Sequence, residues 1–263
     1  FGYLVETATK LVVVNGDQED ILAQLKRIKP SVKVEKVSVS ALKGYEINKG
    51  KTTYIINEKT ITLPGLHPEV LAISLQLVNH LLQYLDILFD PTYKNFHLPP
   101  GRSSVFKGKK DVTIIDSTYN SNLASLTAIL NLFNKYSADK KWLVLGDMLE
   151  QGNLEESEHQ KFAEEVIKTK ADNIILLGPR TKKYVYPILK SELKVPIQTF
   201  NGPTEVYDFL RMNIKGGETI LFKGGRSLEG VIELLLADPG DAKYLVRREK
   251  YWVKQRQKRG LPK

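Results

Sequence analysis

The chain has 263 residues, 42% of them hydrophobic and 26% charged, which indicates a globular protein long enough for two domains. Its apolar stretches are broken within about ten residues, which is too short for a membrane span. It contains no cysteine, which excludes disulfides, thiol catalysis and thiolate metal sites and is compatible with a reducing cytoplasm. The net charge of +9 lies almost entirely in residues 243–263, which hold nine Lys or Arg and one acidic residue.

The first hundred residues combine an α/β start with a β-rich middle. Residues 11–14 are expected to form a buried strand, followed by a helix over about 17–29 that Pro30 ends. Four β-rich runs (32–39, 44–47, 52–56 and 60–63) are separated by turn residues and predict a meander of hairpins. A long helix is expected from about Pro68 to about Ile87, and the proline-rich stretch 89–101 is the best candidate for an interdomain connection.

One segment in this region, Asn48 to Thr53, is similar to the end of a phosphate-binding loop. The Walker pattern requires four residues between its two glycines, whereas Gly44 and Gly50 enclose five. A phosphate-binding loop also leads into a helix, but the residues after Lys51 have the pattern of a strand. We therefore predict a hairpin turn at this position.

After Arg102 strands and helices alternate regularly. Apolar runs near 112–115, 142–145, 174–177, 196–199 and 219–222 predict strands, and the segments between them have helical spacing. Five such units in succession predict a doubly wound, mostly parallel, Rossmann-like sheet.

Polar residues follow three of these strands. They form the segments Asp116 to Asn122, Gly146-Asp147-Met148 with Glu150 and the later His159, and Lys223-Gly-Gly-Arg226-Ser227. Because parallel strands end at the same edge of a sheet, these groups are expected to converge on a ligand site with cations beside carboxylates and amides. The alternative is structural: capped strand-to-helix turns, with Lys223 and Arg226 paired to Asp147 or Asp116.

The tail after residue 242 allows two interpretations. Its basic residues, with Tyr251 and Trp252 among them, are compatible with an anionic partner such as RNA, anionic lipid or an acidic protein. Alternatively, the tail is a solvated helix that docks on its own domain through one aromatic side chain.

The polar segments resemble those of the Mur ligases. The resemblance rests on Pro100-Gly-Arg102, Tyr119-Asn120-Ser-Asn122, Leu145-Gly-Asp-Met-Leu-Glu-Gln-Gly152 with His159 seven residues later, and Lys223-Gly-Gly-Arg-Ser227. Two earlier segments, Val14-Asn-Gly-Asp17 and Leu63-Pro-Gly-Leu-His67, resemble family motifs more loosely. The resemblance implies that residues 1–98 are the latter part of a central ATPase domain, that 99–242 are a C-terminal Rossmann-like domain, and that 243–263 are a basic tail.

The resemblance also implies an activity. Such ligases use ATP and Mg²⁺ to activate a carboxylate as an acyl phosphate, which an amine then attacks to form an amide. The substrates expected here are UDP-N-acetylmuramoyl-tripeptide and D-alanyl-D-alanine, which are joined in peptidoglycan synthesis. A cytoplasmic, monomeric protein is expected. The chain begins at Phe1 rather than Met, and the phosphate-binding loop, the catalytic residues and most Mg²⁺ ligands are expected upstream, so the chain alone is expected to be inactive.

By the same resemblance, site residues can be assigned in two groups, with no metal ligand among them. The expected nucleotide-binding residues are Arg102, Asp116, Tyr119, Asn120 and His67, and the expected substrate-binding residues are Asn122, Asp147, His159, Lys223 and Arg226.

The chain departs from the family pattern at several positions. Pro68 and Leu71 stand where asparagines are usual, Ser117 stands where an acidic residue is expected beside the ribose, and Gly225 replaces the usual serine. These departures leave two alternatives: a divergent, non-catalytic binding module that uses the basic tail, or a related ligase for another amino acid substrate.

Overall fold

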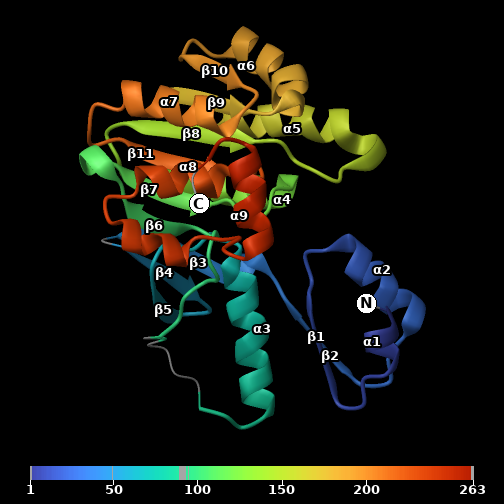
Figure 1. Cartoon of the computed structure of the whole chain (residues 1–263). Helices are drawn as coiled ribbons and strands as arrows, with labels where there is room; N and C mark the ends of the chain where they lie inside the picture. The colour runs from blue at the N-terminus through green and yellow to red at the C-terminus, as the bar shows by residue number, and fades with distance from the viewer. Residues whose placement is uncertain (1, 49, 89–92, 94, 262–263) are drawn as a thin grey trace. The chain divides into compact units, whose positions relative to one another are not determined.

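The protein is described by a computed structural model that covers residues 2–48, 50–88, 93 and 95–261. By its internal contacts the chain divides into two compact units, Phe1–Phe96 and His97–Lys263 (Figure 1). This division falls close to the expected boundary between residues 98 and 99, and it includes the basic tail in the second unit. None of the helices in the described part of the chain combines the length and the apolar character that a membrane crossing requires.

The first unit contains two small sheets and three helices among its described residues. In chain order these elements are α1 (Gly2–Glu6), β1 (Leu11–Asn15), α2 (Glu19–Ile28), β2 (Lys33–Val37), β3 (Leu42–Asn48), β4 (Lys51–Ile56), β5 (Lys59–Pro64) and α3 (Leu71–Tyr84). Strands β1 and β2 pair in parallel, and β3, β4 and β5 form an antiparallel sheet. The expected meander is therefore wrong for the run 32–39, because α2 connects β1 to β2 as a crossover that permits parallel pairing.

Helix α2 ends where the sequence predicts. Lys29 has a left-handed backbone (φ 51°), its amide bonds to the carbonyl of Leu25, and Pro30 follows. Helix α3 is shorter than the expected range. The carbonyl of Pro68 accepts a hydrogen bond from Leu71 in a turn before the helix, and a left-handed residue, Asp86 (φ 53°), follows its end.

The segment that is similar to a phosphate-binding loop forms a hairpin turn, as predicted. Asn48 of β3 lies opposite Lys51 of β4 in an antiparallel register. Gly50, between the two strands, has a φ of 73°, which a residue without a Cβ adopts readily. A strand and not a helix follows this turn, so it has no helix N-terminus to bind phosphate.

The second unit is built on one six-stranded sheet. In chain order its elements are β6 (Ser104–Lys107), β7 (Thr113–Ser117), α4 (Leu123–Lys135), β8 (Lys141–Gly146), α5 (Glu155–Ile167), β9 (Asn173–Leu177), a π-helical turn (Thr181–Val185), α6 (Tyr186–Glu192), β10 (Ile197–Phe200), α7 (Pro203–Asn213), β11 (Thr219–Lys223), α8 (Leu228–Leu235), a 3₁₀ helix (Pro239–Tyr244) and α9 (Lys250–Lys258). The strand order is β10-β9-β8-β11-β7-β6, and only β6 pairs antiparallel. The predicted mostly parallel, doubly wound sheet is confirmed.

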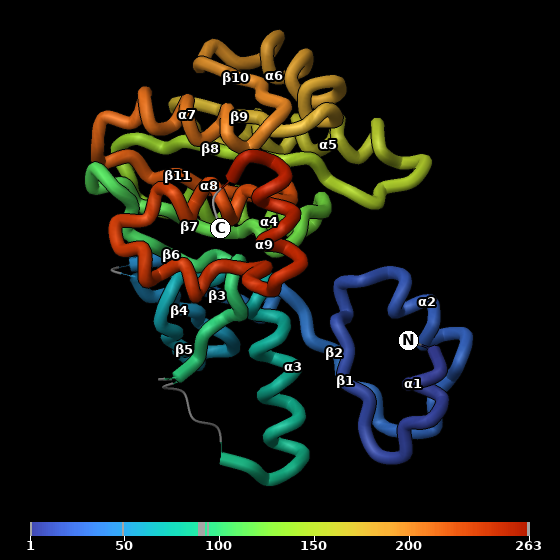
Figure 2. The backbone as a smooth tube through the Cα atoms, in the orientation of Figure 1, coloured from blue at the N-terminus to red at the C-terminus, as the bar shows by residue number. Residues whose placement is uncertain are grey.

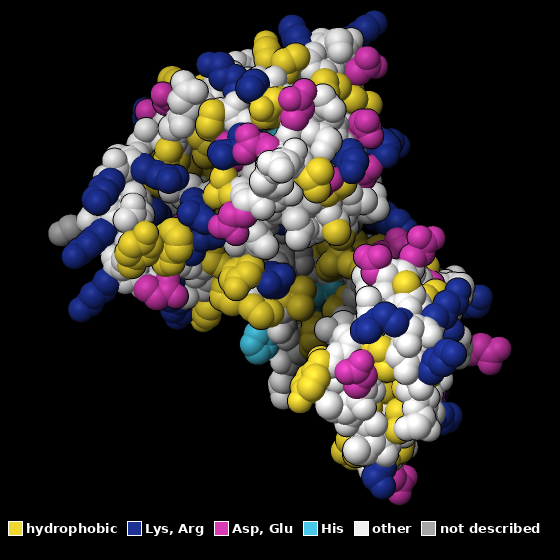
Figure 3. All heavy atoms as spheres, turned by 90° about the vertical axis from the view of Figure 1, so that its right-hand side faces the viewer, with side chains coloured by type: hydrophobic (Ala, Val, Ile, Leu, Met, Phe, Trp, Pro, Cys, Tyr) yellow, Lys and Arg dark blue, Asp and Glu magenta, His cyan; other side chains and the backbone are white. Residues whose placement is uncertain are grey.

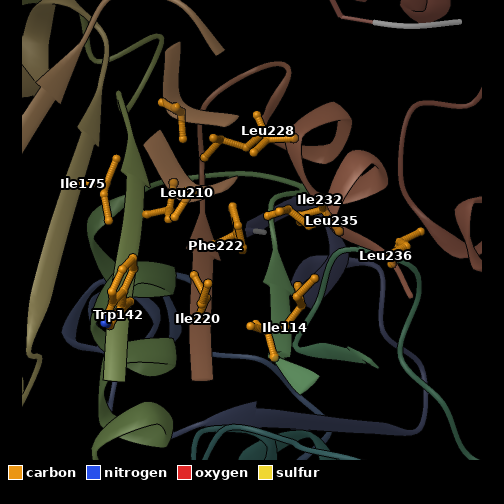
Figure 4. Close-up of a cluster of buried hydrophobic side chains, with 14 of the residues drawn as sticks. Ile114, Trp142, Ile175, Leu210, Ile220, Phe222, Leu228, Ile232, Leu235 and Leu236 are labelled. Atoms are coloured by element: carbon orange, nitrogen blue, oxygen red, sulfur yellow. The ribbon is translucent and has the colours of Figure 1, made fainter. Parts of the chain in front are cut away.

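The core of this unit explains the strand patterns. Every residue of β8 and β11 is buried, which is expected of central parallel strands with both faces covered. Figure 4 shows Ile114, Ile220 and Phe222 from neighbouring strands facing the side chains of the covering helices, including Leu210 of α7 and Ile232 of α8. These apolar contacts fix the positions at which the strands end.

The strand order also sets the position of the polar segments. Strand β11 lies between β8 and β7, with Lys223 opposite both Ser117 and Leu145. The segments that follow β7, β8 and β11 therefore adjoin at one edge of the sheet, as predicted.

Candidate functional site

A cavity of about 660 Å³ lies at this edge of the second unit. Each of the three polar segments contributes to its wall: Tyr119 and Asn120 after β7, Asp147 after β8, and Arg226 after β11. A fourth segment also lines it, from the basic tail: Leu245, Val246, Arg247, Arg248, Glu249 and Trp252. The convergence of the first three segments was predicted from the sequence, and the contribution of the tail was not.

Glycines allow two of these segments to pack backbone against backbone. A Cβ at Gly146 would lie 2.4 Å from the Cα of Gly225, and a Cβ at Gly224 would lie 2.7 Å from the Cβ of Ser121. Gly224 and Gly225 have φ values of 67° and 70°, which other residues rarely adopt. The second glycine, a departure from the family pattern, thus occupies a position where a side chain would be strained.

The first polar segment presents an aromatic ring to the cavity. The Arg102 guanidinium carbon lies 4.4 Å from the centre of the Tyr119 ring, and that ring is 49% exposed. The Asn120 side chain is occupied within the segment, because its oxygen accepts a hydrogen bond from the Ser121 amide at 2.8 Å. A cation over one face of an exposed ring is a suitable surface for a flat ligand such as a nucleobase.

Asp116 is not among the residues that line the cavity. Its side chain is fully buried, and one carboxylate oxygen accepts bonds from the amide (2.9 Å) and the hydroxyl (2.7 Å) of Thr118. Burial raises the pKa of this carboxyl to about 6. The carboxyl thus holds the turn that precedes Tyr119, and its role in nucleotide binding stays a prediction.

Lys223 is also buried, with 3% of its surface exposed. Its ammonium donates a hydrogen bond to the backbone carbonyl of Asn120, and neither Asp147 nor Asp116 forms an ion pair with it among the described residues. Burial, with a smaller contribution from the positive charge of Arg102, lowers the pKa of Lys223 to about 8. This lysine ties the end of β11 to the segment after β7.

Asp147 lies at the wall of the cavity and is 6% exposed. Its carboxylate accepts hydrogen bonds from the amides of Thr181 (2.8 Å) and Arg180 (3.3 Å), and the Arg180 guanidinium lies 3.5 Å away. The pairing of Asp147 with Lys223 or Arg226, which the structural alternative proposed, is therefore not found among the described residues. The actual partner, Arg180, follows β9, a strand end that carried no sequence motif.

Arg226 is the most accessible cation among the predicted substrate-binding residues. Its side chain is 46% exposed and donates a hydrogen bond to Glu150 at 2.9 Å. Glu150 is itself 82% exposed, so this surface pair contributes little stability and is open to exchange with a charged ligand. Together the two side chains offer one positive and one negative group at the cavity.

Two further predicted substrate residues serve the scaffold. Asn122 is the N-cap of α4, where it accepts a bond from the Ser125 amide at 2.9 Å, as the structural alternative proposed. His159 is fully buried; its Nε2 accepts from the Met148 amide (3.2 Å) and its Nδ1 donates to the carbonyl of Glu155 (2.7 Å). The imidazole thus fixes the segment after β8, and the expectation of a direct substrate contact does not fit its burial.

His67 belongs to the first unit and is described there alone. Its ring is 3% exposed, its Nε2 lies 2.6 Å from the carbonyl of Pro64, and Phe96 packs against it edge-on at 5.2 Å. Burial lowers the pKa of this imidazole, which favours the neutral ring. Its role in nucleotide binding stays a prediction.

Two cofactors, ATP and Mg²⁺, were expected. Among the described residues, no three His, Asp or Glu side chains are grouped as ligands for a metal ion. The exposed ring of Tyr119, with Arg102 above it, fits the base of a nucleotide.

In the tail, the arginine and lysine side chains differ in their surroundings. The guanidinium groups of Arg247, Arg248, Arg256 and Arg259 all bond within the second unit. By contrast, Lys243, Lys250, Lys254 and Lys258 are exposed. On the face drawn in Figure 3, basic and acidic side chains are intermingled. The tail thus docks on its own domain, as the second interpretation proposed, but it does so through its arginines as well as through the aromatic Trp252. An anionic partner for the lysines stays a prediction.

Comparison with known proteins identifies the family of the second unit. Residues 101–226 match the family model described as Mur ligase, glutamate ligase domain. This domain belongs to the Mur ligase family. Its sequence motifs therefore predicted the family correctly.

Two curated relatives carry the same name, UDP-N-acetylmuramoyl-tripeptide--D-alanyl-D-alanine ligase. The protein from Synechocystis sp. is 30% identical over 145 residues and the one from Bacillus subtilis 29% over 141, which is 54% and 52% of this chain. The chain spans about a third (31%) of the length of either relative.

Solved structures show a similar fold over both units. MurF ligase from Thermotoga maritima in complex with ADP has a TM-score of 0.71 at 20% identity, over 85% of this chain and 52% of that one. MurF from Acinetobacter baumannii has a TM-score of 0.70 at 17% identity, over 87% and 52%. At these identities the similarity concerns the fold.

Proposed function

We propose that this chain is part of an ATP-dependent, amide-forming ligase that adds D-alanyl-D-alanine to UDP-N-acetylmuramoyl-tripeptide. The observation that carries the proposal is the match of residues 101–226 to the Mur ligase domain, together with two relatives of that name at 30% and 29% identity. The cavity lies within the matched segment and at the sheet edge where α/β proteins bind ligands. A cytoplasmic location and a monomeric state follow from the proposal as predictions.

The charges at the cavity suit a zwitterionic dipeptide. The guanidinium of Arg226 would bind the terminal carboxylate of D-alanyl-D-alanine, since arginine binds carboxylates through two parallel hydrogen bonds. Glu150, freed from Arg226, would lie beside the ammonium end, with Asp147 further along the wall. Once the bound ammonium has lost a proton, binding of this kind would orient the neutral amine for attack on the activated carbonyl. The amine's second proton and inorganic phosphate would leave as the amide forms.

The nucleotide would occupy the part of the cavity beside Tyr119 and Arg102. ATP supplies the phosphoryl group that activates the tripeptide carboxylate in such a ligase. The chain spans about a third of the length of its relatives, and the phosphate-binding loop and most Mg²⁺ ligands of such a ligase are predicted to lie in the part that it does not include. The isolated chain is predicted to bind ligands without turning them over.

Isothermal titration of the chain with D-alanyl-D-alanine tests this proposal. We expect saturable binding that Arg226→Ala weakens by about tenfold or more, because a charged hydrogen bond contributes about 1.5–3 kcal/mol. Lys254→Ala, an exposed change on α9, is the control and should leave the affinity unchanged. A chain that does not bind the dipeptide, but binds another amino acid from a substrate panel, would support the related-ligase alternative instead.

A further inference from the structure

The segment that follows the matched family domain holds two of the three polar segments in place. The Arg247 guanidinium donates to the backbone carbonyls of Thr118 (3.1 Å) and Tyr119 (2.7 Å). The Arg259 guanidinium donates to the carbonyl of Arg226 (2.7 Å) and to the hydroxyl of Ser227 (3.1 Å). Both arginines lie beyond residue 226, where the family match ends.

The backbone at Arg247 is itself fixed. Its φ is 59°, in the left-handed region that residues with a side chain rarely adopt. Its carbonyl accepts a hydrogen bond from Arg256 at 2.7 Å. Such a conformation persists only where the surroundings determine it, and here they aim the guanidinium at the segment after β7.

A buried ion pair anchors the tail to the domain. Arg256 and Glu229 are both 1% exposed, with a nitrogen–oxygen distance of 3.6 Å, and Glu229 also lies 3.5 Å from Arg247. Figures 1 and 2 show α9 beside α8, and the contact is close: a Cβ at Gly230 of α8 would lie 2.8 Å from the Cδ of Arg256 in α9. A buried pair of this kind specifies one position for the helix that carries it.

The anchored tail completes the cavity. Val246 packs against Gly101: a Cβ built on Gly101 would lie 2.6 Å from the Cγ1 of Val246. The Trp252 ring lies between two cations, with guanidinium carbons of Arg247 at 5.6 Å and Arg226 at 6.0 Å from its centre. Without the tail, the wall formed by residues 245–252 would be missing.

We infer that Arg247 and Trp252 are positioning residues of the ligand cavity: Arg247 holds the Thr118–Asn120 segment in its binding geometry, and Trp252 sets the position of Arg226. This inference rests on the proposed function for the identity of the ligand, but not for the geometry of the segment. Arg247 acts through the two carbonyls it holds and is a positioning residue.

The test compares Arg247→Ala with Arg247→Lys and with the control Lys254→Ala, all in the full chain. Hydrogen–deuterium exchange at the amides of residues 118–120 is measured without ligand, and D-alanyl-D-alanine affinity by titration. We expect about tenfold faster exchange confined to this segment and about tenfold weaker binding in Arg247→Ala. The lysine variant, which provides one compact donor group for two carbonyls, should fall between the two.

The outcomes separate the inference from the proposed function. Unchanged exchange at residues 118–120 in both Arg247 variants would overturn the inference whether or not the chain binds ligand. A parent chain that does not bind D-alanyl-D-alanine, but whose exchange responds to Arg247, would overturn the proposed function alone. If Arg247→Ala does not fold, the exchange of Arg247→Lys and of Trp252→Ala decides the question, and exchange equal to the parent in both would count against the inference.

Discussion

The buried ammonium of Lys223 donates a hydrogen bond to the backbone carbonyl of Asn120, so the last residue of β11 holds the segment that follows β7. The bond crosses between neighbouring strands of the sheet. A cation in this position is costly, since burial disfavours its charged form.

The first prediction concerns the pH dependence of stability. The pKa of Lys223 is lowered from 10.5 to about 8, so between these values the unfolded chain binds more protons than the folded one. This lysine therefore makes the protein more stable as pH rises through that range. Urea midpoints between pH 7.5 and 9.5 should rise more steeply for the parent than for Lys223→Met. Equal slopes in the two proteins would show that the ammonium is not destabilised by burial.

A second prediction concerns Asp116. Its pKa is raised from 3.8 to about 6, so the folded protein loses stability as pH rises through this range, where the unfolded chain has already released the proton. Asp116→Asn removes the buried charge and keeps an oxygen that can accept from Thr118. We expect it to be as stable as the parent at pH 4 and more stable at pH 7.5, by on the order of 1 kcal/mol. A variant less stable than the parent at pH 7.5 would contradict this account.

The fold and the convergence of the site could be predicted from the sequence for a clear physical reason. Central parallel strands bury both faces, so runs such as 142–145 and 219–222 are apolar throughout and easy to recognise. The role of an individual polar side chain was harder to predict. Asn122 and His159 have side chains of the kind that bind ligands, but in the structure they bond to nearby backbone groups. The sequence does not show which of these two partners such a side chain has.

The contribution of the tail to the cavity was not predicted, although docking of its helix on the domain was one of the two interpretations. A high density of arginine and lysine predicts charge at a surface, but not which of these side chains turn inward. The structure shows that the arginines bond internally and the lysines are exposed, which follows the difference between a planar group with five donors and a strongly hydrated ammonium. The signal in the sequence was Trp252, an aromatic residue within a charged helix.

A third prediction concerns the contact between the segments after β8 and β11. Gly146→Ala would place a Cβ 2.4 Å from the Cα of Gly225, a backbone atom that cannot move without displacing the cavity wall. We expect a loss of about 1–3 kcal/mol in the free energy of unfolding, measured in urea. Gly202→Ala is the matched control, because a Cβ there meets its nearest atom at 3.8 Å. If the two variants are equally stable, the contact is looser than described.

A fourth prediction concerns the buried ion pair of the tail. Arg256→Met leaves Glu229 buried with Arg247 as its remaining partner and should cost about 3–5 kcal/mol. The double variant Arg256→Met/Glu229→Gln should recover part of that loss, since no uncompensated charge remains. Chemical denaturation of the parent, the two single variants and the double variant measures the coupling. Additive losses would show that the pair does not interact.

The most direct test of the central claim is to map D-alanyl-D-alanine on the chain by amide chemical shifts in a titration. The account predicts saturable shifts concentrated at residues 119–120, 147–150 and 224–226, with smaller shifts at 245–252. Shifts confined to the first unit, or the absence of saturable shifts at dipeptide concentrations that saturate the calorimetric signal, would contradict it.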